Sequence, residues 1–113
     1  MMIITEIVTW KLVGDIEKDE FISIVDRLEK DFHSQQLGFI DSELLYDKQN
    51  DTWIMIQHWD SLENMHTASK KMFNNPVTDT FVNAIDPKTV KMIMLPQIGA
   101  WSHETVLTGS QGQ

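Results

Sequence analysis

The chain contains no cysteine among its 113 residues, and this absence removes several kinds of chemistry. Disulfide bonds, thiolate metal sites and cysteine nucleophiles are all excluded. Basic residues are also scarce, because 9 Lys and Arg stand against 17 Asp and Glu, for a net charge of −8. Nucleic acids and anionic membranes bind basic surfaces, so we expect neither as a partner.

Long apolar runs are missing as well, since none approaches the ~20 residues of a membrane-spanning helix. Segment 1–6 lacks a positively charged start and is interrupted by Glu6, so no secretory signal is expected. A chain of 113 residues has room for one core, which predicts a soluble, cytoplasmic, single-domain protein. We expect the domain to cover residues 1–103 and a polar, flexible tail to cover residues 104–113.

The apolar residues that are present repeat with two spacings, the alternation typical of strands and the spacing of about 3.6 residues typical of helices. These spacings predict the secondary structure. Segments 2–13, 39–46, 52–59 and 90–101 predict four strands. The last strand is expected to be broken or bulged at Pro96, because proline cannot donate a hydrogen bond to a neighbouring strand.

Helical spacing follows the first and the third of these strands. One helix is expected from Ile16, with Asp15 as its N-cap. Asp60, with Glu63 three residues later, has the pattern of a capping box for a helix that ends near Met72. The apolar residues expected on the buried face of the first helix are Phe21, Ile22, Ile24, Val25, Leu28 and Phe32.

A last helical segment, 77–85, is expected after the cap formed by Asn75 and Pro76. The order strand–helix–strand–strand–helix–strand predicts an α+β fold of the ferredoxin-like βαββαβ type. Such a fold has a four-stranded antiparallel sheet with its helices on one face.

Both faces of the predicted sheet carry apolar residues. The run Trp53-Ile54-Met55-Ile56, for example, places apolar side chains alternately on the two faces of the third strand. The helices cover only one face, so the other needs a cover, and a second copy of the chain is the simplest one. We therefore expect a homodimer in which two sheets pack face to face.

Three short motifs at these positions resemble the antibiotic biosynthesis monooxygenase (ABM) family of the dimeric α+β barrel superfamily. They are Gly38-Phe39-Ile40, Trp59-Asp60-Ser61, and Asn75-Pro76 followed by Phe81. The resemblance covers roughly residues 3–101 and implies a homodimer with one pocket per subunit, between the sheet and the helices. Characterised members include cofactor-free oxygenases of anthrone-type or quinol substrates, heme-degrading oxygenases and an isomerase.

The resemblance assigns functional residues only in part. Anthrone-type oxygenases carry a functional tryptophan at the position of Trp59, with an asparagine four residues before it and a tyrosine six residues after it. Here those two positions hold Met55 and Met65, which cannot donate a strong hydrogen bond to an oxyanion. Both methionines remain candidates for apolar contact with a substrate, and Trp59 has the alternative role of a core aromatic.

The heme-degrading pattern fits less well, because the first strand has no asparagine and segment 77–85 has no histidine. Heme binding through His58 or His66 stays open, but no cofactor is predicted. The single arginine, Arg27, and the lack of a glycine-rich loop argue against phosphorylated substrates. Seven methionines and four tryptophans favour an adaptable apolar cavity for a small apolar or aromatic molecule, although an ordinary core uses the same residues.

His58 and His66 are the candidates for a general base that takes a phenolic or α-carbonyl proton. Strand alternation places His58 on the face of Ile54 and Ile56, and His66 lies on the helix that follows Trp59. Each histidine has the alternative of a structural or solvent-facing position.

Tyr46 and Ser42 share one face of the second strand and are candidates for hydrogen bonds to a substrate oxygen. Tyr46 has an equal alternative at the rim of the dimer. His33 and His103 are expected at the surface. No two histidines have the i, i+4 spacing of helical metal ligands, so no metal site is predicted.

The sequence thus favours a cofactor-independent monooxygenase that acts on an electron-rich aromatic substrate such as a hydroquinone. The expected site comprises His58, His66 and Trp59 as catalytic residues. Two alternatives stay open, a non-catalytic small-molecule-binding domain and an isomerase or lyase of the same fold. The expected substrate-binding residues are Ser42, Tyr46, Met55 and Met65.

Overall fold

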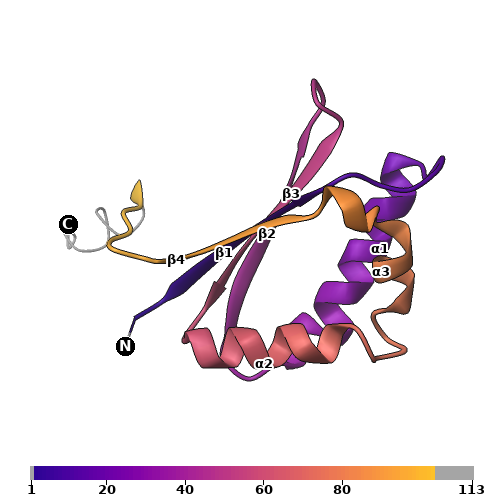
Figure 1. Cartoon of the computed structure of the whole chain (residues 1–113). Helices are drawn as coiled ribbons and strands as arrows, with labels where there is room; N and C mark the ends of the chain where they lie inside the picture. The colour runs from indigo at the N-terminus through magenta and orange to yellow at the C-terminus, as the bar shows by residue number, and fades with distance from the viewer. Residues whose placement is uncertain (1, 104–113) are drawn as a thin grey trace.

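The computed structural model describes residues 2–103, so the segment predicted as a tail lies outside the described residues. These residues form a four-stranded antiparallel sheet in the order β2-β3-β1-β4, with helices on one face (Figure 1). The predicted ferredoxin-like α+β fold is therefore confirmed. The elements are β1 (Ile4–Trp10), α1 (Lys18–Asp31), η1 (His33–Gln35), β2 (Phe39–Asp47), β3 (Thr52–Trp59), α2 (Leu62–Met72), α3 (Asp79–Ala84), η2 (Pro87–Thr89) and β4 (Lys91–Pro96).

The central strands β1 and β3 decide which side chains face the helices. Trp10 lies opposite Trp53, and Glu6 lies opposite Gln57, in an antiparallel register. Every second residue of β3, from Trp53 to Trp59, is buried, because one face of the strand lies against the helical layer. Two polar side chains, Glu6 and Gln57, are therefore held on the covered face.

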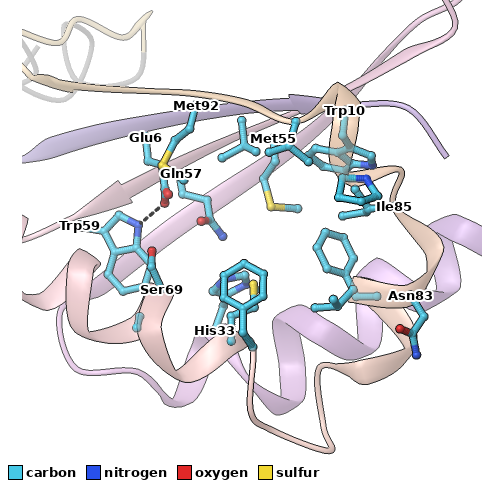
Figure 2. Close-up of a pocket in the computed structure, with 18 of the residues that line it drawn as sticks. Glu6, Trp10, His33, Met55, Gln57, Trp59, Ser69, Asn83, Ile85 and Met92 are labelled. Atoms are coloured by element: carbon cyan, nitrogen blue, oxygen red, sulfur yellow. Dashed lines mark hydrogen bonds between the residues drawn. The ribbon is translucent and has the colours of Figure 1, made fainter. Parts of the chain in front are cut away.

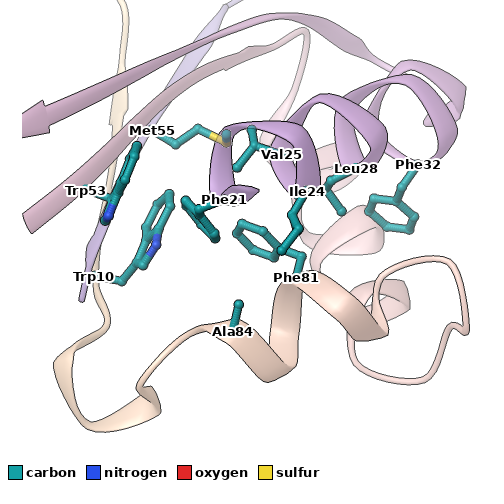
Figure 3. Packing of buried hydrophobic residues seen from close by; sticks show 10 residues of the cluster. All are labelled: Trp10, Phe21, Ile24, Val25, Leu28, Phe32, Trp53, Met55, Phe81 and Ala84. Carbon is teal, nitrogen blue, oxygen red and sulfur yellow. The ribbon is translucent and has the colours of Figure 1, made fainter. Parts of the chain in front are cut away.

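The core on this face is divided into two clusters. The larger cluster joins α1 and α3 to the sheet around Phe21, whose ring meets Trp53 edge-on with centroids 4.9 Å apart (Figure 3). The smaller cluster joins α2 to β1 and β3 near the other end of these strands. Its buried members are Ile4, Trp59, Met65 and Ala68.

The start of α1 differs from the prediction. The helix begins at Lys18, and its N-cap is Glu17 rather than Asp15, with no capping hydrogen bond from the side chain. The predicted apolar stripe is buried except for Ile22, which is 41% exposed because it lies at the edge of the stripe.

The start of α2 also differs by one residue from the predicted capping box. Ser61, not Asp60, is the N-cap, and its Oγ accepts a hydrogen bond from the Asn64 backbone N–H at 3.1 Å. The Asp60 carboxylate instead accepts a hydrogen bond from the Asn64 side chain at 2.8 Å. Gly38 lies against this turn with φ +86, and a Cβ there would overlap Asp60 and Asn64. The entry into β2 therefore requires glycine.

The last helix and the last strand are both shorter than predicted. The Asn75 side chain accepts a hydrogen bond from the Val77 backbone N–H, and the Asn75 carbonyl accepts one from Thr78. These bonds form a turn, so α3 begins only at Asp79. β4 ends at Pro96, the position where the sequence predicts an interruption.

Candidate functional site

A cavity of about 500 Å³ lies between the sheet and the helices (Figure 2). Members of both core clusters line it, including Met55 and Phe81 from one and Trp59 and Ala68 from the other. Its volume falls within the ~300–1,000 Å³ that is usual for small-molecule sites. The other lining residues are Glu6, Val8, Trp10, Val13, His33, Gln57, Ser69, Met72, Phe73, Val82, Asn83, Ile85, Pro87, Val90 and Met92.

A carboxylate is buried in this largely apolar cavity. Glu6 is 5% exposed, and its Oε1 accepts a hydrogen bond from the Trp59 indole Nε1–H at 3.1 Å (Figure 2). Burial raises the pKa of Glu6 above its ordinary value, because the charged form loses its hydration. The bond from Trp59 and the charges of His33 and His66 act in the opposite direction, and the pKa of Glu6 remains raised.

Two buried N–H groups of the cavity have no hydrogen-bond partner within the described residues. They are Gln57 Nε2 and Trp10 Nε1. The Gln57 amide extends into the cavity beside Glu6 in Figure 2. Buried donors are almost always paired in native proteins, so unpaired donors in a cavity point to a ligand acceptor or to water.

His33 is the second titratable group of the cavity, and its predicted surface position is wrong. The residue is 5% exposed, because the chain continues from α1 into η1 beneath the sheet instead of turning out to solvent. Its Nδ1 is hydrogen-bonded to Glu29 Oε2, and the other oxygen of Glu29 accepts a hydrogen bond from Ser42 Oγ. His103, by contrast, is exposed as predicted.

Four of the predicted site residues lie on the helix side of the sheet near the cavity. Trp59 and Met55 line it. Met65 is fully buried in the smaller core cluster and is not part of the lining. His66 is exposed on α2, and it acts on the cavity only through its charge, which lowers the pKa of Glu6.

The other three predicted residues lie outside the cavity. His58 lies on the opposite face of the sheet, where its Nδ1 is 2.6 Å from Asp41 Oδ1, because β3 alternates as predicted. Tyr46 donates a hydrogen bond to Asp51 at 2.7 Å, near the β2–β3 hairpin. Ser42 contacts Glu29 rather than the cavity. We therefore do not place these three side chains in direct contact with a ligand of this cavity.

Sequence reasoning missed the polar residues of the cavity wall, although the strand pattern carries a signal for two of them. Glu6 lies on the face of β1 that also carries Ile4 and Trp10, and Gln57 lies between Met55 and Trp59 on one face of β3. A polar residue on an otherwise buried strand face is a candidate functional residue. His33 has no such signal, because it follows the end of a helix.

The part of the chain that the structure describes contains no group of three or more histidine, aspartate or glutamate residues placed to hold a metal ion. Within the same residues, no helix is both long and apolar enough to cross a membrane. The cavity is therefore lined by residues that carry a carboxylate, an imidazole and two buried N–H groups without a partner among residues 2–103, in apolar surroundings. Such groups suit proton transfer and stabilisation of a negative oxygen.

Comparison with known proteins identifies the fold. No protein-family model and no curated protein matches the sequence. SnoaB, a cofactor-independent oxygenase from Streptomyces nogalater, matches in a mutant form with a TM-score of 0.69 and 17% identity, over 89% of this chain and 98% of that chain.

Two further structures are provisionally described as antibiotic biosynthesis monooxygenases. The protein from Chloroflexus aurantiacus J-10-fl matches with a TM-score of 0.59 and 16% identity, over 88% of this chain and 97% of that chain. The protein from Nitrosomonas europaea matches with a TM-score of 0.58 and 9% identity, over 88% of this chain and 94% of that chain. The chain therefore has the fold of the antibiotic biosynthesis monooxygenases.

Proposed function

We propose that this protein is a cofactor-independent monooxygenase that oxidises a small, neutral, hydroxylated aromatic molecule with O₂. The observation that carries the proposal is an apolar cavity of about 500 Å³ that combines unpaired N–H donors with buried proton acceptors. The likeness of fold to SnoaB, a cofactor-independent oxygenase, supports the same reaction class.

The cavity wall favours a neutral aromatic substrate. Its apolar side chains suit a flat ring, and neither lysine nor arginine is among the lining residues of segment 2–103. An anionic substrate would meet the Glu6 carboxylate without a cation to balance it. The free N–H groups of Gln57 and Trp10 would instead donate to a substrate oxygen, and more strongly once that oxygen becomes negative.

The proposed reaction needs only the substrate, O₂ and a proton acceptor. Loss of the hydroxyl proton gives a substrate anion, which passes one electron to O₂. The resulting substrate radical and superoxide join through a new carbon–oxygen bond. Protonation and loss of water from this peroxide leave a carbonyl group. For a hydroquinone the products are a hydroxyquinone and water, so one oxygen atom enters the product and the other leaves with the two hydrogens that the substrate lost.

We also propose that the protein is a homodimer. On the sheet face without helices, Ile7 lies between Ile56 and Ile93 in the register. Leu45 and Leu95, which are 39% and 50% exposed, extend this apolar surface towards both edges. A second copy that packs on this surface would remove the apolar area from water. Size-exclusion chromatography with light scattering tests this; a monomer at micromolar concentration would contradict it.

Oxygen uptake tests the proposed activity. We would use 1,4-dihydroxynaphthalene, anthrone and catechol as a panel and compare the wild type with the double variant Glu6→Leu/His33→Leu, which lacks both proton acceptors of the cavity. We expect protein-dependent uptake for at least one compound, with water rather than hydrogen peroxide as the second product, and a loss of about 10²- to 10⁴-fold in the double variant. No protein-dependent uptake with any compound would contradict the proposal.

A non-catalytic small-molecule-binding domain is the second candidate. The observation in its favour is that apolar Met55 and Met65 occupy the positions where anthrone-type oxygenases carry an asparagine and a tyrosine. A panel compound that binds without oxygen uptake would support this candidate. Turnover of a panel compound without oxygen would instead indicate the third alternative, an isomerase or lyase.

A further inference from the structure

The buried His33 ring is connected through Glu29 to Ser42 on β2 by two hydrogen bonds in series. His33 Nδ1 bonds to Glu29 Oε2, and Ser42 Oγ donates to Glu29 Oε1. The tautomer in which His33 Nδ1 donates to Glu29 leaves the lone pair of the neutral ring on Nε2, and this tautomer is the one that proton uptake at Nε2 requires.

Nothing in the described residues hydrogen-bonds to His33 Nε2. The ring is held in place by aromatic neighbours, since it stacks on Phe39 with centroids 5.8 Å apart and meets Trp59 edge-on at 6.2 Å. His33 lines the cavity. The imidazole is therefore a fixed ring with one nitrogen bonded to Glu29 and the other without a partner.

The exposures along this chain of hydrogen bonds increase from the cavity outwards. The His33 side chain is 6% exposed and the Glu29 side chain 21% exposed. Glu6, the other proton acceptor of the cavity, is 5% exposed, and the indole of Trp59 occupies its hydrogen-bonding oxygen. Within the described residues Glu6 is hydrogen-bonded only to the buried Trp59, whereas His33 is hydrogen-bonded to the more exposed Glu29.

We infer that His33 is the proton acceptor of the cavity and that Glu29, supported by Ser42, orients the ring and passes its proton to solvent. This inference rests on the proposed function. His33 Nε2 takes the hydroxyl proton of the substrate, and the Nδ1 proton moves to Glu29 and then to water. The titratable groups that face the ring are Glu29 from α1, which is hydrogen-bonded to it, and Glu6 from β1, whose pKa the charge of His33 lowers. Glu29 and Ser42 are positioning residues.

The first test measures the tautomer of His33 by ¹⁵N NMR and requires no substrate. In the wild type we expect the neutral ring to carry its proton on Nδ1. Glu29→Leu should lose this preference, and Glu29→Gln should keep it, because the amide oxygen still accepts the bond. Asp26→Leu is the control, since Asp26 lies on the same helix and pairs with Lys30 at the surface. A wild-type ring protonated on Nε2 would overturn the inference.

The second test separates the transfer of the proton from the orientation of the ring. With a panel compound that is turned over, Glu29→Gln should lower kcat about 10- to 100-fold at an unchanged KM while the tautomer stays the same. His33→Gln should lower kcat at least as far, and Asp26→Leu should leave it unchanged. A Glu29→Gln variant with wild-type kcat would show that no proton passes through Glu29, which overturns the relay. If the wild type turns over no compound, the proposed function fails. The tautomer measurement still decides whether His33 Nδ1 donates its proton to Glu29.

Discussion

The two faces of the sheet place their polar residues differently. The face that the helices cover holds Glu6 and Gln57 buried among apolar side chains, whereas the uncovered face has Ile7 flanked by Ile56 and Ile93 in the middle and carries Asp41, Glu43 and His58 towards the β2 edge. Burial of a polar group costs free energy unless it is paired, and Gln57 Nε2 is not paired. The covered face therefore carries an unpaired polar group at a cost in stability, while the uncovered face exposes apolar surface.

The largest expected effect is a difference in kcat between substitutions of two neighbouring residues that lie on opposite faces of β3. Gln57→Leu removes an N–H donor of the cavity and should lower kcat about 10²- to 10³-fold without loss of folding stability. His58→Leu, one residue further along the chain, should change kcat by no more than about twofold. Steady-state oxygen uptake measures both. Equal losses in the two variants would remove the functional difference between the faces.

The uncovered face can be tested with a charge. Ile56→Asp would bury two carboxylates in a symmetric dimer, one from each subunit, and should raise the dimer dissociation constant at least about 100-fold. Ile22→Asp is the control, because Ile22 is already 41% exposed on α1. Sedimentation equilibrium measures both constants. A dimer that tolerates Ile56→Asp would exclude this face as the interface.

The two indoles of the cavity provide a matched pair on the covered face. Trp59→Phe leaves the buried Glu6 carboxylate without its donor and should destabilise the protein about 1–3 kcal/mol more than Trp10→Phe, which removes an unpaired donor. Urea denaturation measures the difference. Equal free energies of unfolding would mean that the bond between Trp59 and Glu6 contributes nothing.

Two buried alanines distinguish the cavity from the packed core. Ala68 lines the cavity and Ala84 belongs to the larger core cluster. Ala84→Leu should cost about 1–3 kcal/mol through overpacking, whereas Ala68→Leu can extend into free space and should cost less than about 1 kcal/mol. Thermal denaturation tests this order. A larger loss for Ala68→Leu would show that the cavity is not available to a side chain.

The smallest expected effect is the pH dependence of stability. The folded-state pKa of Glu6 is raised, so the folded state binds this proton more tightly than the unfolded state. Stability from this group is present below its ordinary value of 4.5 and is lost as pH rises through the raised pKa. Glu6→Gln should therefore gain stability relative to the wild type over this pH range. A difference that does not vary with pH would contradict the raised pKa.

The fold could be predicted because the spacing of apolar residues along the sequence indicates which side of each strand or helix is buried. The alternation in β3 correctly separated the face of Trp53 and Met55 from the face of Ile54, Ile56 and His58. The ends of elements were less predictable, since they depend on local hydrogen bonds such as the one that makes Ser61 the cap of α2.

The candidate site was predicted only in part. Trp59 and Met55 line the cavity, but the search for a base among the histidines of β3 and α2 passed over His33. Its burial depends on the path of η1 after α1 and on the contact with Trp59, which is distant in sequence. Such tertiary contacts produce no regular spacing of residues that a sequence analysis could detect.

One titration tests the central claim that the covered face, and not the other, binds a hydroxylated aromatic ligand. The ligand 1,4-dihydroxynaphthalene would be added without oxygen while the side-chain N–H signals of Gln57 and Trp59 and the ring signals of His58 are followed by NMR. We predict saturable shifts at Gln57 and Trp59 with no shift at His58. Shifts confined to His58, or no shift at any of the three, would contradict the account.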